Sequence, residues 1–117
     1  MVYQKRFKQP KYRNKKVEVD GIVFDSMREA KRYKELSMLL MAGNISDLKL
    51  QVPFILIEKY RNGEGKAIRK MEYIADFVYK QDGKTVVEDT KGFRTKEYRI
   101  KKKLFEHKYY PITIREV

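Results

Sequence analysis

An Asp-x-Lys pair at the end of an apolar segment is the first feature of this sequence that could perform chemistry. In the segment from Lys84 to Lys91, two valines precede Glu88 and Asp89. If this segment is a strand, Asp89 and Lys91 point to one face and Glu88 points to the other. Ionised groups on a buried strand cost several kcal/mol unless they are paired or bind a metal ion. The pair therefore predicts either a core ion pair or a functional site.

Two further carboxylates are predicted to lie near this pair. Asp76 stands in the middle of a segment whose other six residues, from Tyr73 to Tyr79, are apolar or aromatic. Glu29 lies at one end of an apolar helical stripe, three residues after a serine that could cap the helix. Together with Asp89 they would form a cluster of oxygen ligands suited to Mg²⁺ or Mn²⁺. Two alternatives stay open: an aspartate pairs with Lys91, or Glu29 is a capping residue.

The charge of the chain favours a polyanionic partner. Lys and Arg number 28 against 16 acidic residues, so the net charge is +12, and nucleic acid is the partner that this imbalance favours over an anionic membrane surface. Seven of these cations lie in the first sixteen residues, which contain no acid and are predicted to form a basic arm that contacts nucleic acid. A solubilising tail is the alternative. The cations of the arm are Lys5, Arg6, Lys8, Lys11, Arg13, Lys15 and Lys16.

A second basic surface is predicted on the helix that follows Lys91. Four cations at steps of three and four residues share one helix face, and a phosphate backbone is favoured over a simply solvated face. Arg94 and Thr95 could add donors there, while Ile100, Leu104 and Phe105 would anchor the helix. The four cations are Lys96, Arg99, Lys102 and Lys103.

Composition excludes several classes of site. The chain has no cysteine, so disulfides, thiolate zinc sites and cysteine nucleophiles are excluded. His107 is the only histidine, which excludes sites built from several imidazoles. No apolar run is long enough to span a bilayer, and the N-terminus lacks the apolar middle of a signal peptide, so we expect a cytoplasmic protein.

The pattern of elements predicts one mixed α/β (α+β) domain over residues 17–117, preceded by the arm at residues 1–16. A right-handed crossover through the second helix would place the last strand parallel to the third, in one mixed sheet covered by helices. The expected elements are a hairpin from Val17 to Phe24, a helix from the Ser26 cap to Ala42, strands Leu50–Lys59, Lys70–Lys80 and Lys84–Lys91, a helix from the Thr95 cap to about His107, and a strand Ile112–Val117.

The segments Tyr73–Phe77 and Val87–Gly92, in this order of elements, resemble the core motif of the PD-(D/E)XK nuclease superfamily. Within it the chain resembles small phage- and prophage-encoded proteins similar to endonuclease-I-type and Holliday junction resolvases. The resemblance implies a restriction-endonuclease-like core of order α-β-β-β-α-β. It departs from the family where Ala75 replaces the proline that gives the motif its name.

Carried over residue by residue, the resemblance implies that Asp76 and Asp89 are the motif carboxylates, Lys91 is the motif lysine and Glu29 is the acidic residue of the first helix. Glu88 competes with Asp89, but only Asp89 shares the strand parity of Lys91. Gln51 resembles a recurrent polar position to which no role is assigned. The implied catalytic set is Glu29, Asp76, Asp89 and Lys91, of which the three carboxylates hold the metal ion.

These observations together predict an Mg²⁺- or Mn²⁺-dependent DNA endonuclease that hydrolyses phosphodiester bonds. We expect it to select branched or Holliday junction DNA by shape, in phage recombination or DNA processing. Cutting two strands of a junction with one site per chain implies a homodimer. The alternatives are a nucleic-acid-binding protein without catalysis, and a nicking or sequence-specific endonuclease.

Overall fold

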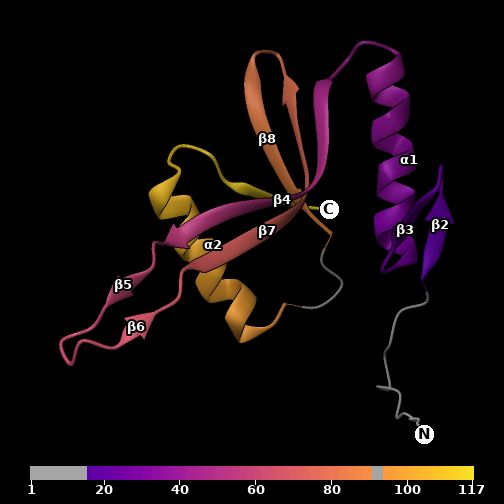
Figure 1. The fold of residues 1–117 in the computed structure, drawn as a ribbon. Helices are drawn as coiled ribbons and strands as arrows, with labels where there is room; N and C mark the ends of the chain where they lie inside the picture. Colours follow the sequence, from indigo (N-terminus) through magenta and orange to yellow (C-terminus); the bar gives the residue numbers. More distant parts are fainter. Residues whose placement is uncertain (1–15, 91–93) are drawn as a thin grey trace, which may run out of the picture.

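A computed structural model describes residues 16–90 and 94–117 (Figure 1). The secondary-structure elements follow one another along the described chain from the β2–β3 hairpin to a short C-terminal strand. In order they are β2 (Val17–Val19), β3 (Ile22–Phe24), α1 (Met27–Met41), β4 (Ser46–Ile57), β5 (Tyr60–Arg61), β6 (Ala67–Ile68), β7 (Met71–Gln81), β8 (Lys84–Asp89), α2 (Lys96–Lys108) and β9 (Ile114–Glu116).

The main sheet has four strands in the order β4-β7-β8-β9. The β4–β7 and β7–β8 pairs are antiparallel, while β8 and β9 are parallel. The expected mixed α+β fold, with a mixed sheet and two helices, is therefore confirmed. In Figure 1, α1 and the β2–β3 hairpin lie beside one end of the sheet and α2 lies beside the other. No helix in the described ranges is long and apolar enough to cross a membrane.

Local sequence signals explain where the elements begin and turn. Ser26 caps α1 by accepting a hydrogen bond from the Glu29 backbone N–H, and Thr95 caps α2 in the same way. The Asp82-Gly83 turn between β7 and β8 has positive φ at both residues. This conformation matches the twist of a two-residue hairpin, which explains the tight connection.

The buried residues form two clusters, one beside α1 and one beside α2, and β7 contributes to both. The α1-side cluster contains Phe24, Ala30, Leu36, Ile45, Phe77 and Tyr79. The α2-side cluster contains Leu56, Tyr73, Ala75, Val87, Tyr98, Phe105 and Ile114. The expected anchoring by Phe105 and Leu104 is confirmed, but Ile100 is half exposed. The prediction for Ile100 was wrong because helical spacing alone does not indicate how much of the helix surface the sheet buries.

The strands differ from the expectation in several places. β4 begins at Ser46 rather than Leu50, and residues 58–70 form a separate ribbon, β5–β6, instead of a simple turn. β8 ends at Asp89, so Thr90 lies just beyond the strand. The last strand begins at Ile114 rather than Ile112, because the Ile112 backbone N–H is engaged by Tyr109 in the turn after α2.

Candidate active site

The long strands β4 and β7 change their packing partner at Gln51 and Asp76, which lie opposite each other in the antiparallel register. Within β7, Tyr73 packs in the α2-side cluster and Phe77 in the α1-side cluster. Gln51 has a φ of 52°, which a residue other than glycine rarely adopts. The strand pair therefore turns its buried face from one helix to the other here, and Asp76 lies where both layers meet.

Glu29 reaches this position from the first turn of α1. Its backbone N–H donates to Ser26 Oγ at 3.1 Å, which satisfies the helix cap. Its carboxylate, on a residue only 7% exposed, accepts a hydrogen bond from Gln51 Nε2 at 2.8 Å. The cap and the site therefore use different atoms of the same residue.

Asp76 is held from two sides. Its Oδ2 accepts hydrogen bonds from the Thr90 backbone N–H at 2.9 Å and from Thr90 Oγ1 at 2.8 Å. Its Oδ1 lies 3.3 Å from Gln51 Nε2. One amide nitrogen thus bridges the carboxylates of Glu29 and Asp76, which come from different elements and are far apart in sequence.

The surroundings of Glu29 raise the pKa of its carboxyl group. Burial is the largest cause that raises its pKa, followed by the negative charges of Asp76 and Asp25, with a smaller contribution from Asp89. A backbone hydrogen bond at Asp25 acts in the opposite direction. The resulting pKa of Glu29 is about 7. Two carboxylates brought this close favour either a shared proton or a cation.

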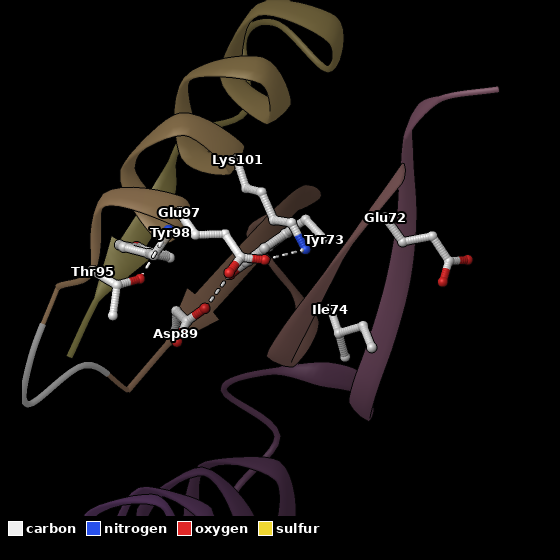
Figure 2. A pocket seen from close by; sticks show the side chains of 8 residues that line it. All are labelled: Glu72, Tyr73, Ile74, Asp89, Thr95, Glu97, Tyr98 and Lys101. Atoms are coloured by element: carbon white, nitrogen blue, oxygen red, sulfur yellow. Dashed lines mark hydrogen bonds and ion pairs between the residues drawn. The ribbon is translucent and has the colours of Figure 1, made fainter. Parts of the chain in front are cut away.

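Asp89 lies on the other face of β8 from Glu88, as strand parity predicts. It is 1% exposed, and its Oδ2 accepts a hydrogen bond from the Tyr73 hydroxyl. Burial and this bond raise the pKa of Tyr73. Figure 2 shows Asp89 beneath the first turn of α2, in a pocket of about 470 Å³ that Thr95 and Tyr98 also line.

Glu88 is the fully buried acid of the sheet, with no exposed surface. Arg32 of α1 donates two hydrogen bonds to its carboxylate, at 2.8 and 2.7 Å. Tyr79 donates a third, and Arg115 lies at 3.6 Å. Glu88 is therefore part of a structural ion pair. This role explains why it is adjacent to Asp89 in the sequence but does not belong to the same site.

The geometry brings Glu29 and Asp76 together through Gln51 and leaves Asp89 on the α2 side, bonded to Tyr73. In residues 16–90 and 94–117, no group of three or more His, Cys, Asp or Glu side chains is spaced to hold a metal ion. Lys91 and the arm cations Lys5, Arg6, Lys8, Lys11, Arg13 and Lys15 lie outside the described residues.

Comparison with known proteins assigns a family. Residues 9–116 match the family described as "Protein of unknown function (DUF1064)", a match that covers nearly the whole chain. The chain belongs to DUF1064. No curated protein and no solved structure matches it. The DUF1064 match begins inside the predicted arm, at residue 9, and extends through β9.

The basic residues of this DUF1064 chain divide into paired and open groups. Arg94, just before α2, donates to Glu116 at 2.8 Å, and Lys102 of α2 lies 3.7 Å from Glu106. Arg99 and Lys103 are exposed and line, with those residues, a pocket of about 310 Å³. Lys96 is exposed but does not line it, and Lys16 pairs with Asp25 at 3.1 Å. Thr95 uses its hydroxyl to cap α2.

Sequence reasoning missed three roles at this site. Gln51 bridges the two carboxylates, Thr90 positions Asp76, and Arg32 neutralises Glu88. Strand alternation would place Thr90 on the face of Glu88, so parity does not signal its contact with Asp76, which depends on β8 ending at Asp89. Gln51 was singled out only by the resemblance and without a role, because its contact depends on a positive φ within a strand, which residue type does not predict.

Proposed function

We propose that this chain is a divalent-metal-dependent DNA endonuclease with its active site at Glu29 and Asp76. The observation that carries the proposal is the sharing of one neutral amide nitrogen by the two carboxylates. The buried Glu88 is neutralised by arginine. In the described part of the chain, Glu29 accepts a hydrogen bond from the Gln51 amide, and Asp76 accepts from that amide and from Thr90, none of which carries a positive charge. Two close carboxylates without a described countercharge suit a cation.

The donor set fits Mg²⁺ or Mn²⁺. Both ions prefer carboxylate oxygens, and Asp76 Oδ1 and Glu29 Oε2 already point to one common atom. Asp89 is the proposed third ligand, because continuing the register from the Phe77–Glu88 pair by one residue places it opposite Asp76. A divalent ion held there would polarise a phosphate oxygen and lower the pKa of a bound water.

The remaining residues position these ligands. Thr90 fixes Asp76 through two hydrogen bonds, so that only Oδ1 faces Glu29. Gln51 is exposed, which leaves the site open to a phosphodiester from solvent. Lys91 is proposed to orient the attacking water or to neutralise charge that develops on the phosphate.

The order of α1, β4, β7, β8, α2 and β9 supports a restriction-endonuclease-like core as part of the same proposal. The basic face of α2, with Arg99 and Lys103 exposed, would contact the DNA backbone beside the site. Branched or junction DNA is the proposed substrate. A homodimer is the proposed assembly, supported by the exposed side chains of Val23 in the β2–β3 hairpin and Tyr110 after α2.

A second candidate is a nucleic-acid-binding protein without catalysis. The observation that favours it is the missing three-ligand cluster in the described ranges, since Asp89 is bonded to Tyr73 instead of joining Asp76. The basic surface alone would then account for the function.

Cleavage assays separate the two candidates. Labelled linear, nicked, forked and four-way DNA would be incubated with Mg²⁺, Mn²⁺, Ca²⁺ or EDTA, using wild type and Asp76→Asn. The endonuclease predicts cuts with Mg²⁺ or Mn²⁺ only, strongest on branched DNA, and retained DNA binding by the variant. Binding without cleavage in any metal would support the second candidate and refute the first.

A further inference from the structure

The β5–β6 ribbon extends the long strands β4 and β7 beyond the sheet. The pairs Ile57–Met71 and Tyr60–Ile68 keep one register, so the ribbon continues the same antiparallel pair. Figure 1 shows it projecting away from both helices. No residue from 57 to 71 belongs to either buried cluster. The ribbon therefore contributes nothing to the core that would explain its length.

The tip of the ribbon is ordered by its own hydrogen bonds. Asn62 Oδ1 accepts from the backbone N–H groups of Glu64 and Lys66, each at 2.9 Å. Arg61 Nη1 donates to the Gly65 carbonyl at 2.8 Å, and Gly65 has a φ of +81°, which favours glycine. Because the tip is already ordered, binding to a partner does not require the conformational entropy cost of ordering it.

The ribbon also carries the charge of a nucleic-acid contact. Residues 58–70 contain five Lys or Arg against two Glu. Tyr60 is 52% exposed and shares a face with its cross-strand partner Ile68. Cations would meet phosphates, while an aromatic and aliphatic face suits base edges and thymine methyl groups. This composition fits DNA better than an apolar protein surface.

The dimensions of the ribbon select the groove. The major groove of B-form DNA, about 12 Å wide, admits a two-stranded ribbon, whereas the minor groove, about 6 Å wide, does not. The base of the ribbon, at Met71, lies five residues along β7 from Asp76, or about 17 Å of extended chain. A contact there would lie about half a turn of duplex from the cleaved bond.

We propose that the β5–β6 ribbon, residues 58–70, inserts into the major groove of a duplex arm beside the cleavage site. The inference rests on the proposed function for its DNA partner and deepens it, since it names the duplex element that the site requires. It makes a binding claim that is independent of metal and of cleavage.

The test compares two triple variants that each remove three exposed lysine or arginine charges. One changes the ribbon, Lys59→Gln, Lys66→Gln and Arg69→Gln. The matched control changes the end of the main sheet away from the ribbon: Lys49→Gln in β4, Lys80→Gln in β7 and Lys84→Gln in β8. Affinity for a duplex of about three helical turns would be measured in EDTA over a range of salt, after thermal melting has established that both variants are folded.

We expect the ribbon variant to bind at least about tenfold more weakly, with the slope of log K against log salt smaller by up to about 2.7, since each lost phosphate contact removes about 0.9. The control should bind as wild type does. Methylation of guanine N7, which lies in the major groove, should be blocked by wild type and restored by the ribbon variant. Equal losses in the two variants, or unchanged N7 protection, would overturn the inference.

Duplex RNA supplies an independent comparison. Its major groove is too narrow for a ribbon, so RNA affinity should not depend on the ribbon charges. An equal loss on RNA would overturn groove insertion, and so would a change in oligomer mass by light scattering in place of a change in DNA affinity. If ribbon-dependent binding is found without cleavage in Mg²⁺ or Mn²⁺, only the proposed endonuclease activity fails. If cleavage is found with no ribbon dependence of binding, only this inference fails.

Discussion

Two groups of acidic residues, Glu88 of β8 and the pair of Glu29 from α1 and Asp76 from β7, have different partners. Glu88 has no exposed surface and is held by two hydrogen bonds from Arg32 and one from Tyr79. Glu29 and Asp76 share a single amide nitrogen of Gln51. The negative charge of Glu88 is balanced by arginine. No described cation balances the negative charge of Glu29 and Asp76.

This contrast teaches that burial alone does not identify a functional acid. Glu88 is more buried than Glu29, yet its charge is matched by arginine, and the ion pair ties α1 to β8. Glu29 carries a raised pKa because Asp76 and Asp25 add to the effect of burial. A carboxylate pair that the fold forces together without arginine is the better candidate for a cation site.

The largest expected effect is on catalysis. Asp76→Asn should lower cleavage more than about 100-fold, because the loss of even an outer-shell partner of a metal costs about that much. Asp89→Asn and Lys91→Ala should act similarly, while DNA affinity stays measurable. Single-turnover cleavage and binding assays would be compared with Asp82→Asn, an exposed turn residue. If Glu88→Gln were inactive yet fully stable and Asp89→Asn were active, the assignment of Asp89 would be wrong.

The second largest expected effect is a loss of folding stability when the ion pair of Glu88 is broken. Arg32→Met should destabilise the fold by about 3–5 kcal/mol, because it leaves the Glu88 charge buried without its main partner. Urea denaturation at neutral pH measures this loss. Arg28→Met, an exposed change on the same helix, is the control. Equal stability of the two variants would show that Glu88 does not depend on Arg32.

A smaller effect is the dependence of stability on pH. Since the pKa of Glu29 is raised to about 7 from 4.5, the folded state binds more protons than the unfolded state between these values. The contribution of Glu29 to the free energy of unfolding therefore decreases as the pH rises from about 4.5 to 7, and it is constant above about pH 7. Glu29→Gln should reduce this decrease in stability with pH, whereas Glu64→Gln at the exposed ribbon tip should leave it unchanged. Unfolding curves across this range test it, and a slope that persists in Glu29→Gln would contradict the cause.

The smallest effect concerns the link between Asp89 and the α2 pocket. Tyr73→Phe removes one hydrogen bond to Asp89, so Asp89 should join the metal site more readily and Mn²⁺ affinity should rise up to about fivefold. Tyr98→Phe, which removes a bond to Glu116 in the same region, is the control. Weaker Mn²⁺ binding by Tyr73→Phe would show that Tyr73 supports the site rather than competing with it.

Much of the fold could be predicted because its signals are local. The Ser26 and Thr95 caps, the Asp82-Gly83 turn and strand alternation in β8 place both helices and separate Glu88 from Asp89. The contacts of Gln51 and Arg32 could not be predicted, because they join residues far apart in sequence through the twist of β4 and the packing of α1. The β5–β6 ribbon between the expected strands Leu50–Lys59 and Lys70–Lys80 could not be predicted, because its tip depends on hydrogen bonds from the Glu64 and Lys66 backbone N–H groups to Asn62.

The most direct test of the central claim is metal binding without DNA. Mn²⁺ titration by calorimetry or electron paramagnetic resonance would compare wild type, Asp76→Asn and the exposed-site control Asp82→Asn. If Glu29 and Asp76 hold a divalent cation, wild type and Asp82→Asn should bind Mn²⁺ with the same affinity, and Asp76→Asn should lose it. Unchanged Mn²⁺ affinity in Asp76→Asn would contradict the account.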